Sequence, residues 1–384
     1  MIPRDLTPRL LKAASHLPVV TVTGPRQSGK TTLCRRTFPA HPHVNLELPD
    51  VRAHAISDPR AFLADHPDGA ILDEVQRAPD LMSYLQDDVD RHPDPGRWIL
   101  TGSQNLLLLD AVNQSLAGRA AVLHLLPCTW PEVQRFEGAP MDLDRVLRAG
   151  GYPRIHDRRM PPAEFLDGYI ATYLERDVRS IINVGDLVTF QTFLGLCAGR
   201  TGQLLNLSAL ASDCGIAQPT ARAWLSVLES SFVAFRLPAW HGNLRKRLTR
   251  TPKLHFWDTG LVCRLLGINE PAQLRTHPLR GPIFETWVVS ETARRRLHRG
   301  QRGGLHHFRT QQGAEVDLVL DDGNGLALIE AMAGQTLDPR LADGLRDVVG
   351  ILGEGRVNSC RLVHGGDERR TVGPVEMTGW GAFD

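Results

Sequence analysis

Short apolar runs that end in polar residues recur along the first part of this 384-residue chain. Runs rich in valine, isoleucine and leucine predict buried strands, and the amphipathic stretches between them predict helices. Strands of a parallel sheet that is buried on both faces show such continuous runs, whereas half-exposed strands alternate. The pattern therefore predicts an α/β domain with strands near residues 17–22, 44–47, 69–74, 98–101 and 121–125.

A glycine-rich turn follows the first of these strands and precedes a helix predicted at residues 32–36. The turn has the P-loop spacing, in which two glycines let backbone N–H groups approach phosphate oxygens at a helix N-terminus. We expect Lys30 to reach the β- and γ-phosphates and Thr31 to bind Mg²⁺. The sequence thus predicts an ATP site that consists of Gly24, Pro25, Arg26, Gln27, Ser28, Gly29, Lys30, Thr31 and Thr32.

Two acids, Asp73 and Glu74, end the apolar run at residues 69–74. The carboxyl ends of parallel strands emerge beside the ligand in this class of fold. We expect Asp73 to bind Mg²⁺, directly or through water, and Glu74 to orient and activate the attacking water, because phosphoryl transfer depends on positioning and charge stabilisation. The expected reaction is ATP hydrolysis; two solvated loop acids are the alternative.

Polar residues adjoin two further strands. Ser103 and Gln104 follow the strand at residues 98–101. One of them contacts the γ-phosphate or the attacking water; the alternative is that they only cap a helix. Arg119 precedes the strand at residues 121–125. It either stabilises transition-state charge, in its own chain or in a neighbouring subunit of a homo-oligomer, or is a surface arginine. With Lys30 and Glu74, these residues complete the expected catalytic set.

Residues 207–228 show helix-turn-helix spacing, with one short apolar helical face, a turn that contains Gly215, and a second amphipathic helix. The run at residues 232–237 predicts the first strand of a wing. We expect the exposed residues that face a DNA groove to be Gln218, Thr220, Arg222 and Trp224. A purely structural lid is the alternative.

A basic stretch without acids follows and includes Arg245, Lys246, Arg247, Arg250 and Lys253. Arginine and lysine beside a helix-turn-helix predict contacts with the phosphates of double-stranded DNA. A solvated hairpin, or pairing with an acidic face elsewhere in the chain, is the alternative.

Acids on a predicted helix and on two predicted strands near the C-terminus resemble the core of the PD-(D/E)xK nucleases. The matching residues are Glu285, Asp317 and Glu330, and Met332 stands where that core has lysine. The lysine positions water and stabilises the charged transition state, which a thioether cannot do. The resemblance therefore implies a degenerate restriction-endonuclease-like domain without nuclease activity, unless a cation such as Arg309 comes in from elsewhere.

Composition narrows the class of protein. Hydrophobic residues make up 42% and charged residues 23%, as in soluble globular proteins. The net charge of +1 predicts no global attraction to nucleic acid, so DNA binding requires a local patch. Six scattered cysteines without a CxxC pair argue against a zinc site and fit a reducing cytoplasm. No apolar run is long enough to span a membrane, and residues 1–16 predict an amphipathic helix.

Several motifs together carry a family resemblance: GPRQSGKTT, AILDEVQRAPDL, WILTGSQ and SLAGR, followed by GGYPRIHD and YLERDVR. Over most of its length the chain resembles prokaryotic AAA+-type ATPases with an appended C-terminal domain of unknown function. The resemblance implies a Walker A motif at residues 24–31, a Walker B motif at Asp73 with a catalytic Glu74, and a sensor around Ser103 and Gln104.

The expected fold class is α/β, with a P-loop AAA+-like domain at residues 1–140, a helical and winged-helix region at residues 141–260, and a restriction-endonuclease-like domain at residues 261–384. The favoured function is a DNA-associated ATPase that uses nucleotide state to move the winged helix. The alternative is a nucleotide-dependent switch that binds a protein partner. An active ATP-dependent nuclease is disfavoured by Met332.

Overall fold

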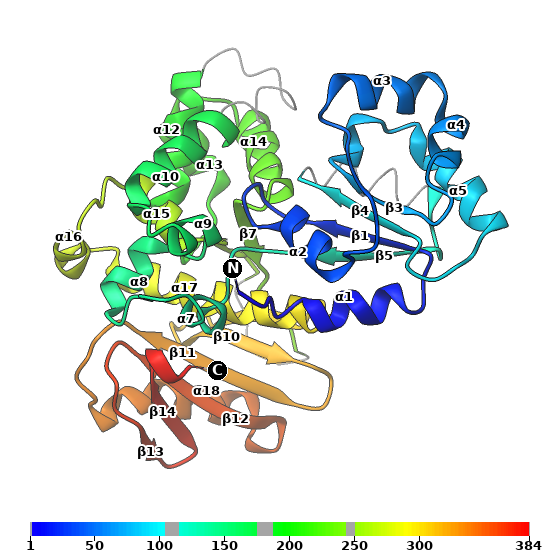
Figure 1. Cartoon of the computed structure of the whole chain (residues 1–384). Coiled ribbons are helices and arrows are strands. Elements are labelled where there is room, and N and C mark those ends of the chain that lie inside the picture. The colour runs from blue at the N-terminus through cyan, green and yellow to red at the C-terminus, as the bar shows by residue number, and fades with distance from the viewer. Residues whose placement is uncertain (1, 104–114, 175–186, 243–249, 384) are drawn as a thin grey trace. The chain divides into compact units, whose positions relative to one another are not determined.

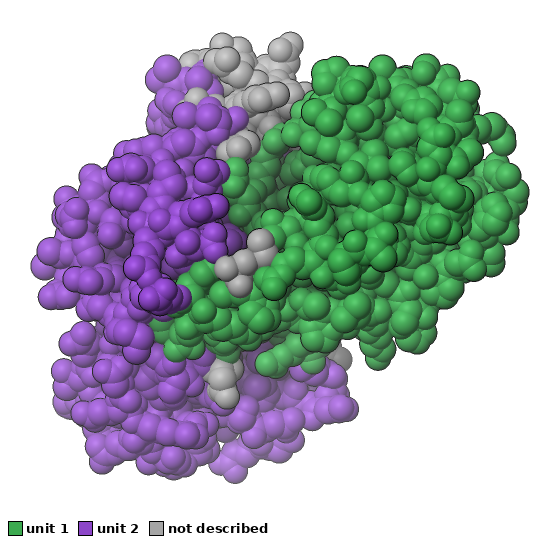
Figure 2. All heavy atoms as spheres, viewed as in Figure 1, with its two compact units in different colours: residues 1–136, 230–232, 294–301 green, residues 137–229, 233–293, 302–384 purple. Residues whose placement is uncertain are grey.

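The computed structural model describes residues 2–103, 115–174, 187–242 and 250–383. The chain divides into two compact units, which Figure 2 draws in different colours. Unit 1 comprises residues 1–136, 230–232 and 294–301, and unit 2 comprises the remainder of the chain. Among the described residues, no helix is long and apolar enough to cross a membrane.

Unit 1 is built on a five-stranded sheet with the order β2-β3-β4-β1-β5, in which every adjacent pair is parallel (Figure 1). The three central strands are buried at every residue. This sheet confirms the predicted α/β domain with buried parallel strands. The strands are β1 (Val19–Thr23), β2 (His43–Asn45), β3 (Ala70–Asp73), β4 (Trp98–Gly102) and β5 (Ala120–His124).

Helices cover both faces of this sheet. Successive side chains of a strand point to opposite faces, so Leu72 and Leu100 pack with α3, α4 and α5, whereas Ile71 and Ile99 pack with α1 and α2. The sheet therefore has an apolar core on each side. The helices of unit 1 include α1 (Thr7–Ala14), α2 (Lys30–Thr37), α3 (Pro49–Ser57), α4 (Pro59–Ala64), η1 (Val75–Arg77), α5 (Leu81–Arg91) and α7 (Trp130–Gln134).

The first part of unit 2 consists mainly of helices, with a small antiparallel sheet of order β6-β8-β7. Its strands are β6 (Gln203–Leu204), β7 (Ala234–Leu237) and β8 (Lys253–Phe256). Its helices are α8 (Leu143–Ala149), α9 (Pro153–Asp157), α10 (Pro162–Tyr169), η2 (Ile170–Leu174), α12 (Leu187–Ala198), α13 (Leu207–Cys214), α14 (Gln218–Ser230), α15 (Thr259–Leu265) and α16 (Pro271–Thr276).

The helices α13 and α14 are joined by a turn in which Gly215 has a φ of 70°, a left-handed conformation that favours glycine. The predicted exposure of Trp224 on α14 is wrong, because only 6% of this residue is exposed. Its ring meets the rings of Phe190 and Phe193 edge-on, with centroids 5.3 Å apart in both pairs. Trp224 is thus part of the core beneath α12 rather than a DNA-facing residue.

The last part of unit 2 is a six-stranded mixed sheet with the order β13-β14-β12-β11-β10-β9. Strands β9, β10 and β11 are antiparallel, whereas β11, β12 and β14 are parallel. Helix α18 (Asp343–Leu352) packs Leu345 and Val348 against this sheet, and α17 (Arg280–His298) precedes it in the chain. The strands are β9 (Leu305–Arg309), β10 (Glu315–Asp321), β11 (Leu326–Met332), β12 (Val357–His364), β13 (Arg370–Val372) and β14 (Val375–Gly379).

Candidate functional site

The turn at residues 24–29 connects β1 to α2 and requires glycine at both ends. Gly24 has a φ of +150°, and a Cβ atom on it would lie 2.1 Å from the carbonyl oxygen of Leu125. Gly29 caps α2 with a left-handed φ of 94°. A loop with this freedom can turn its backbone N–H groups toward an anion at the N-terminus of a helix.

Lys30, the first residue of α2, points back into this loop. Its Nζ atom donates hydrogen bonds to the carbonyl oxygens of Gly24 at 2.9 Å and Pro25 at 2.8 Å. Burial lowers the pKa of Lys30 to about 8. The ammonium is therefore held inside the turn, at the position from which a P-loop lysine reaches phosphates.

Asp73, the last residue of β3, accepts hydrogen bonds from residues of three neighbouring elements. The hydroxyl of Thr31 on α2 lies 2.9 Å from Oδ2, and Nε2 of His43 on β2 lies 3.3 Å from the same oxygen. The hydroxyl of Thr101 on β4 donates to Oδ1. Sequence reasoning missed His43 and Thr101. Thr101 could have been predicted, because it directly follows Leu100 on β4 and Asp73 directly follows Leu72, the partner of Leu100 on the adjacent parallel strand.

Glu74 follows β3 in an unusual backbone conformation. It has φ 56° and ψ 45°, a left-handed conformation that costs a residue with a Cβ atom about 1–3 kcal/mol and clusters at functional sites. Its Oε2 atom accepts hydrogen bonds from the hydroxyl of Ser103 at 3.1 Å and from the side-chain amide of Gln76. The turn thus aims the Glu74 carboxylate toward the end of β4, and Gln76 is a second contact that sequence reasoning missed.

Comparison with known proteins places this architecture in a family. Residues 16–134 match the family described as an AAA domain. Two relatives are each 35% identical to this chain over 321 residues: the uncharacterized proteins Rv2008c of Mycobacterium tuberculosis and Mb2031c of Mycobacterium bovis. The matched residues make up 83% of this chain and 71% of each relative. The chain belongs to their family. It carries an AAA-type ATPase domain, as the sequence motifs predicted.

Two further regions of this AAA protein match domains of unknown function, DUF8612 at residues 141–272 and DUF4143 at residues 280–379. Among solved structures, the Walker-type ATPase PABY2304 of Pyrococcus abyssi is similar at 17% identity, covering 69% of this chain and 96% of that chain with a TM-score of 0.47. RuvB of Thermotoga maritima is similar at 19% identity, covering 62% and 90%, with a TM-score of 0.34.

Arg119 of this AAA domain lies near the amino ends of the strands, whereas the P-loop follows the carboxyl end of β1. Its guanidinium donates to both carboxylate oxygens of Asp90, at 2.5 and 2.9 Å. Ala120 pairs with Val19 at the start of β1, whereas the P-loop follows Thr23 at the end of β1. Four residue steps along a strand span roughly 13 Å. The predicted action of Arg119 on phosphates bound by its own chain is therefore wrong, and a role in a neighbouring subunit stays a prediction.

The residues predicted to contact DNA fall into three groups. Arg245, Lys246 and Arg247 lie outside the described residues, as does Gln104 of the predicted sensor. Arg222 on α14 and Arg250 before β8 are exposed. The prediction for Lys253 is wrong, because this residue of β8 is only 2% exposed and is paired with acids.

Lys253 is the centre of a buried ion cluster in unit 2. Its Nζ atom lies 2.7 Å from Oε1 of Glu285, 2.7 Å from Oε1 of Glu315 and 3.0 Å from Oδ1 of Asp317. Glu330 adjoins the cluster, since its Oε2 atom accepts the backbone N–H of Asp317 at 3.3 Å. The acids of the nuclease-like motif are thus brought together around a lysine from an element that precedes the motif.

The cation at the centre of the cluster is Lys253, whereas the sequence suggested Arg309. Met332 carries no charge, and Arg309 lies 3.0 Å from Oε2 of Glu315 at the margin of the cluster. Burial lowers the pKa of Lys253, but attraction by Asp317, Glu285 and Glu315 outweighs it, so the pKa is raised and the ammonium stays charged.

Carboxylates outnumber cations in this cluster. Burial, followed by repulsion from Asp317, raises the pKa of both Glu285 and Glu330 well above the ordinary value. The ring of His255 is fully buried. Its Nε2 atom has no hydrogen-bond partner among the described residues and lies 3.9 Å from Oε1 of Glu285. Protons on the carboxyls of Glu285 and Glu330 therefore offset the excess of acids, and a bound cation would have to displace those protons.

Proposed function

We propose that this protein binds ATP with Mg²⁺ at residues 24–32 and hydrolyses it. The observation that carries the proposal is the convergence of Lys30, the Thr31–Asp73 pair and Glu74 at the carboxyl edge of one parallel sheet. A hydroxyl and a carboxylate 2.9 Å apart form the kind of oxygen donor pair that Mg²⁺ accepts while it keeps several waters. These residues fit the cation that an AAA-type ATPase domain requires.

Each residue has one role in this proposal. Lys30 exchanges the carbonyl oxygens of Gly24 and Pro25 for the β- and γ-phosphate oxygens, and Thr31 and Asp73 hold Mg²⁺, which neutralises phosphate charge when bound. Glu74 accepts the proton of the attacking water. The hydroxyl of Ser103 fixes the orientation of that carboxylate, which makes Ser103 a positioning residue.

The test is phosphate release from ATP by the purified protein, with Mg²⁺ and with a chelator. We expect release that requires Mg²⁺ and that Lys30→Ala abolishes together with nucleotide binding. Lys12→Ala is the matched control, because Lys12 is an exposed lysine of α1 away from the loop. An unaltered protein that releases no phosphate contradicts the proposal.

We also propose that the protein associates with double-stranded DNA through α14 and the basic stretch at residues 245–250. Exposed Arg222 and Arg250 support this proposal. Alanine at Arg245, Lys246 and Arg247 should flatten the dependence of affinity on log salt concentration by about one unit for each phosphate that the variant no longer neutralises. A wild-type protein that does not bind DNA at low salt favours the alternative, a nucleotide-dependent switch with a protein partner.

The Lys253 cluster favours a second function. The chain order α17, β9, β10, β11, α18, β12 carries Glu285, Asp317 and Glu330 on its first, third and fourth elements, in keeping with a restriction-endonuclease-like domain. Inactivity was expected because Met332 replaces a lysine, but Lys253 brings an ammonium within 3.0 Å of Asp317. We therefore propose metal-dependent hydrolysis of phosphodiesters at this cluster.

The donors that a divalent cation would use are the four carboxylates, which lie around one buried ammonium and the peripheral Arg309. When bound, such a cation would activate water and stabilise charge on the phosphate. Plasmid incubated with the protein and Mn²⁺ or Mg²⁺ should be cut, and Asp317→Asn should abolish cleavage. Absence of cleavage by the unaltered protein with either metal, with and without ATP, supports the degenerate site instead.

A further inference from the structure

Arg4 is a buried arginine beneath the P-loop that no sequence motif identified. Its side chain is 8% exposed and makes three hydrogen bonds within unit 1. Nη1 donates to the carbonyl oxygen of Ser28 at 2.7 Å, Nη2 to that of Leu126 at 2.8 Å, and Nε to Oε1 of Glu132 at 2.9 Å. One of its three acceptors is therefore a peptide group of the phosphate-binding turn.

That hydrogen bond fixes the direction of a neighbouring amide. In a planar trans peptide the C=O and N–H groups point in opposite directions. Because the carbonyl of Ser28 points toward Arg4, the N–H of Gly29 points away from it. Gly29 directly precedes Lys30, and its N–H is among those that the P-loop motif uses for phosphate.

Arg4 is held in turn by Glu132, a residue of α7. Oε1 of Glu132 also accepts the backbone N–H of Asp5 at 2.6 Å, and Oε2 accepts that of Thr129 at 2.9 Å. Burial raises the pKa of Glu132, but the adjacent Arg4 guanidinium outweighs it, so the pKa lies below the ordinary value. Glu132 is thus a fixed anion that anchors Arg4.

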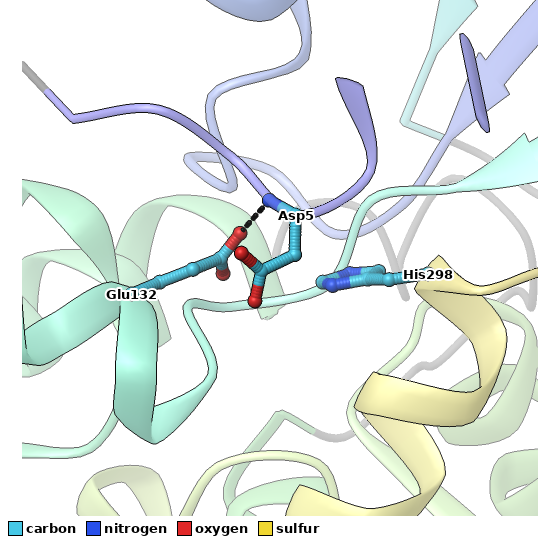
Figure 3. A group of neighbouring side chains, drawn as sticks. All are labelled: Asp5, Glu132 and His298. Atoms are coloured by element: carbon cyan, nitrogen blue, oxygen red, sulfur yellow. Dashed lines mark hydrogen bonds between the residues drawn. The ribbon is translucent and has the colours of Figure 1, made fainter. Parts of the chain in front are cut away.

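Asp5, Glu132 and His298 gather in one place, as Figure 3 shows, with atoms close enough to resemble a metal site. The carboxylates there already accept hydrogen bonds, from Arg4 to Glu132 and from Thr129 to Asp5 at 3.1 Å. Burial lowers the pKa of His298 to about 4, so its ring is neutral at physiological pH and does not compete with Arg4 for Glu132. The two carboxylates of this cluster are thus engaged by the arginine and by neighbouring donors.

We propose that Arg4 is a positioning residue for the nucleotide: through the carbonyl of Ser28 it orients the Ser28–Gly29 peptide so that the Gly29 N–H faces the phosphates. A permanent cation beneath the turn also favours an anionic ligand. The inference rests on the proposed function, since it concerns the same ATP site. It adds a residue that lies outside residues 16–134, the range matched by the AAA domain.

The test compares Arg4→Ala, Arg4→Lys and the control Arg135→Ala. Arg135 pairs with Asp5 at 2.6 Å and donates to the carbonyl of Pro3, so it belongs to the same network, but neither of these partners is in the P-loop. Removal of a hydrogen bond from a charged donor predicts a KM for ATP and a Kd for ADP about tenfold or more higher in Arg4→Ala, with kcat within about twofold. Arg135→Ala should match wild type.

Arg4→Lys should lie between wild type and Arg4→Ala, about threefold above wild type, because one ammonium cannot serve three acceptors in different directions. A merely structural role gives a different result, since partial unfolding lowers the active fraction and hence the apparent kcat while KM stays unchanged. If Arg4→Ala does not fold, Arg4→Lys decides the question.

Unchanged KM and Kd in the Arg4 variants, or an equal rise in Arg135→Ala, overturns the inference while the proposed function stands. A wild-type protein that binds nucleotide without hydrolysing it overturns the proposed hydrolysis and leaves Kd for ADP to decide on Arg4. A wild-type protein that binds no nucleotide overturns both.

Discussion

Replacing Lys253 with methionine removes a buried ammonium and leaves a side chain of similar length. The change deletes two hydrogen bonds to nearly buried carboxylates, those of Glu285 at 2.7 Å and Asp317 at 3.0 Å. At about 1.5–3 kcal/mol for each bond to a charged group, two bonds give a destabilisation of about 3–6 kcal/mol. Removal of one partner of a buried ion pair costs a similar amount, about 3–5 kcal/mol. Glu315 contributes less, because its side chain is 27% exposed and also pairs with Arg309.

The destabilisation should depend on pH. The pKa values of Glu285 and Glu330 are raised in the folded protein, so stability linked to their protonated forms is present below their unfolded pKa and is lost as pH rises. Without the ammonium these folded pKa values rise further. The difference between variant and wild type should therefore increase as pH rises past the folded pKa values of these carboxyls in the wild type.

Equilibrium urea unfolding, followed by tryptophan fluorescence at several pH values from 5 to 9, measures this difference in the free energy of unfolding. Arg309→Met is the control, because Arg309 forms a partly exposed ion pair with Glu315 that should be worth about 1 kcal/mol or less. A destabilisation below about 1 kcal/mol for Lys253→Met, or one that decreases as pH rises, would refute the account of the cluster.

Two further predictions concern the ATP site. Phosphate charge should raise the pKa of Lys30 from about 8, so nucleotide binding should take up a proton and affinity should fall as pH rises above that value. Calorimetric titration with ADP between pH 7.5 and 9.5 measures this change. An affinity that does not depend on pH contradicts the prediction. Arg119→Ala should leave the ATPase rate of the monomeric protein unchanged, because Arg119 lies near the amino ends of the strands and pairs with Asp90. A large decrease of kcat in the monomer would contradict this prediction.

The parallel sheet and the P-loop could be predicted because their signals are local. Asp73 ends an apolar run, and Lys30 and Thr31 belong to one eight-residue motif. Parallel strands share one carboxyl edge, so a motif after one strand and an acid after another were expected to meet. The bond between Thr31 and Asp73 spans 42 residues and still follows from that rule.

Two predictions failed for physical reasons. The burial of Lys253 depends on partners far away in the sequence, and the location of Arg119 depends on which end of its strand it adjoins. The three acids that pair with Lys253 lie 32 to 64 residues further along the chain, so its basic neighbours suggested an exposed patch. The prediction for Arg119 failed because this residue precedes its strand. It therefore lies at the amino end of the sheet, away from the carboxyl end where phosphates are expected to bind.

Trp224 was an avoidable error. It lies three residues after Ala221 and four before Leu228, two apolar residues that are buried. Residues three and four apart share one face of a helix. The spacing itself therefore places Trp224 inside.

The most direct test of the central claim is phosphate release by Glu74→Gln. The substitution keeps the shape of the side chain and its contact with Ser103 but removes the group that accepts the proton of water. We expect ATP binding within about twofold of wild type, and kcat lower by about a hundredfold or more. Asp68→Asn, at an exposed acid of the same unit, should match wild type. Turnover by Glu74→Gln equal to wild type would contradict the account, because Glu74 could then not be the catalytic base.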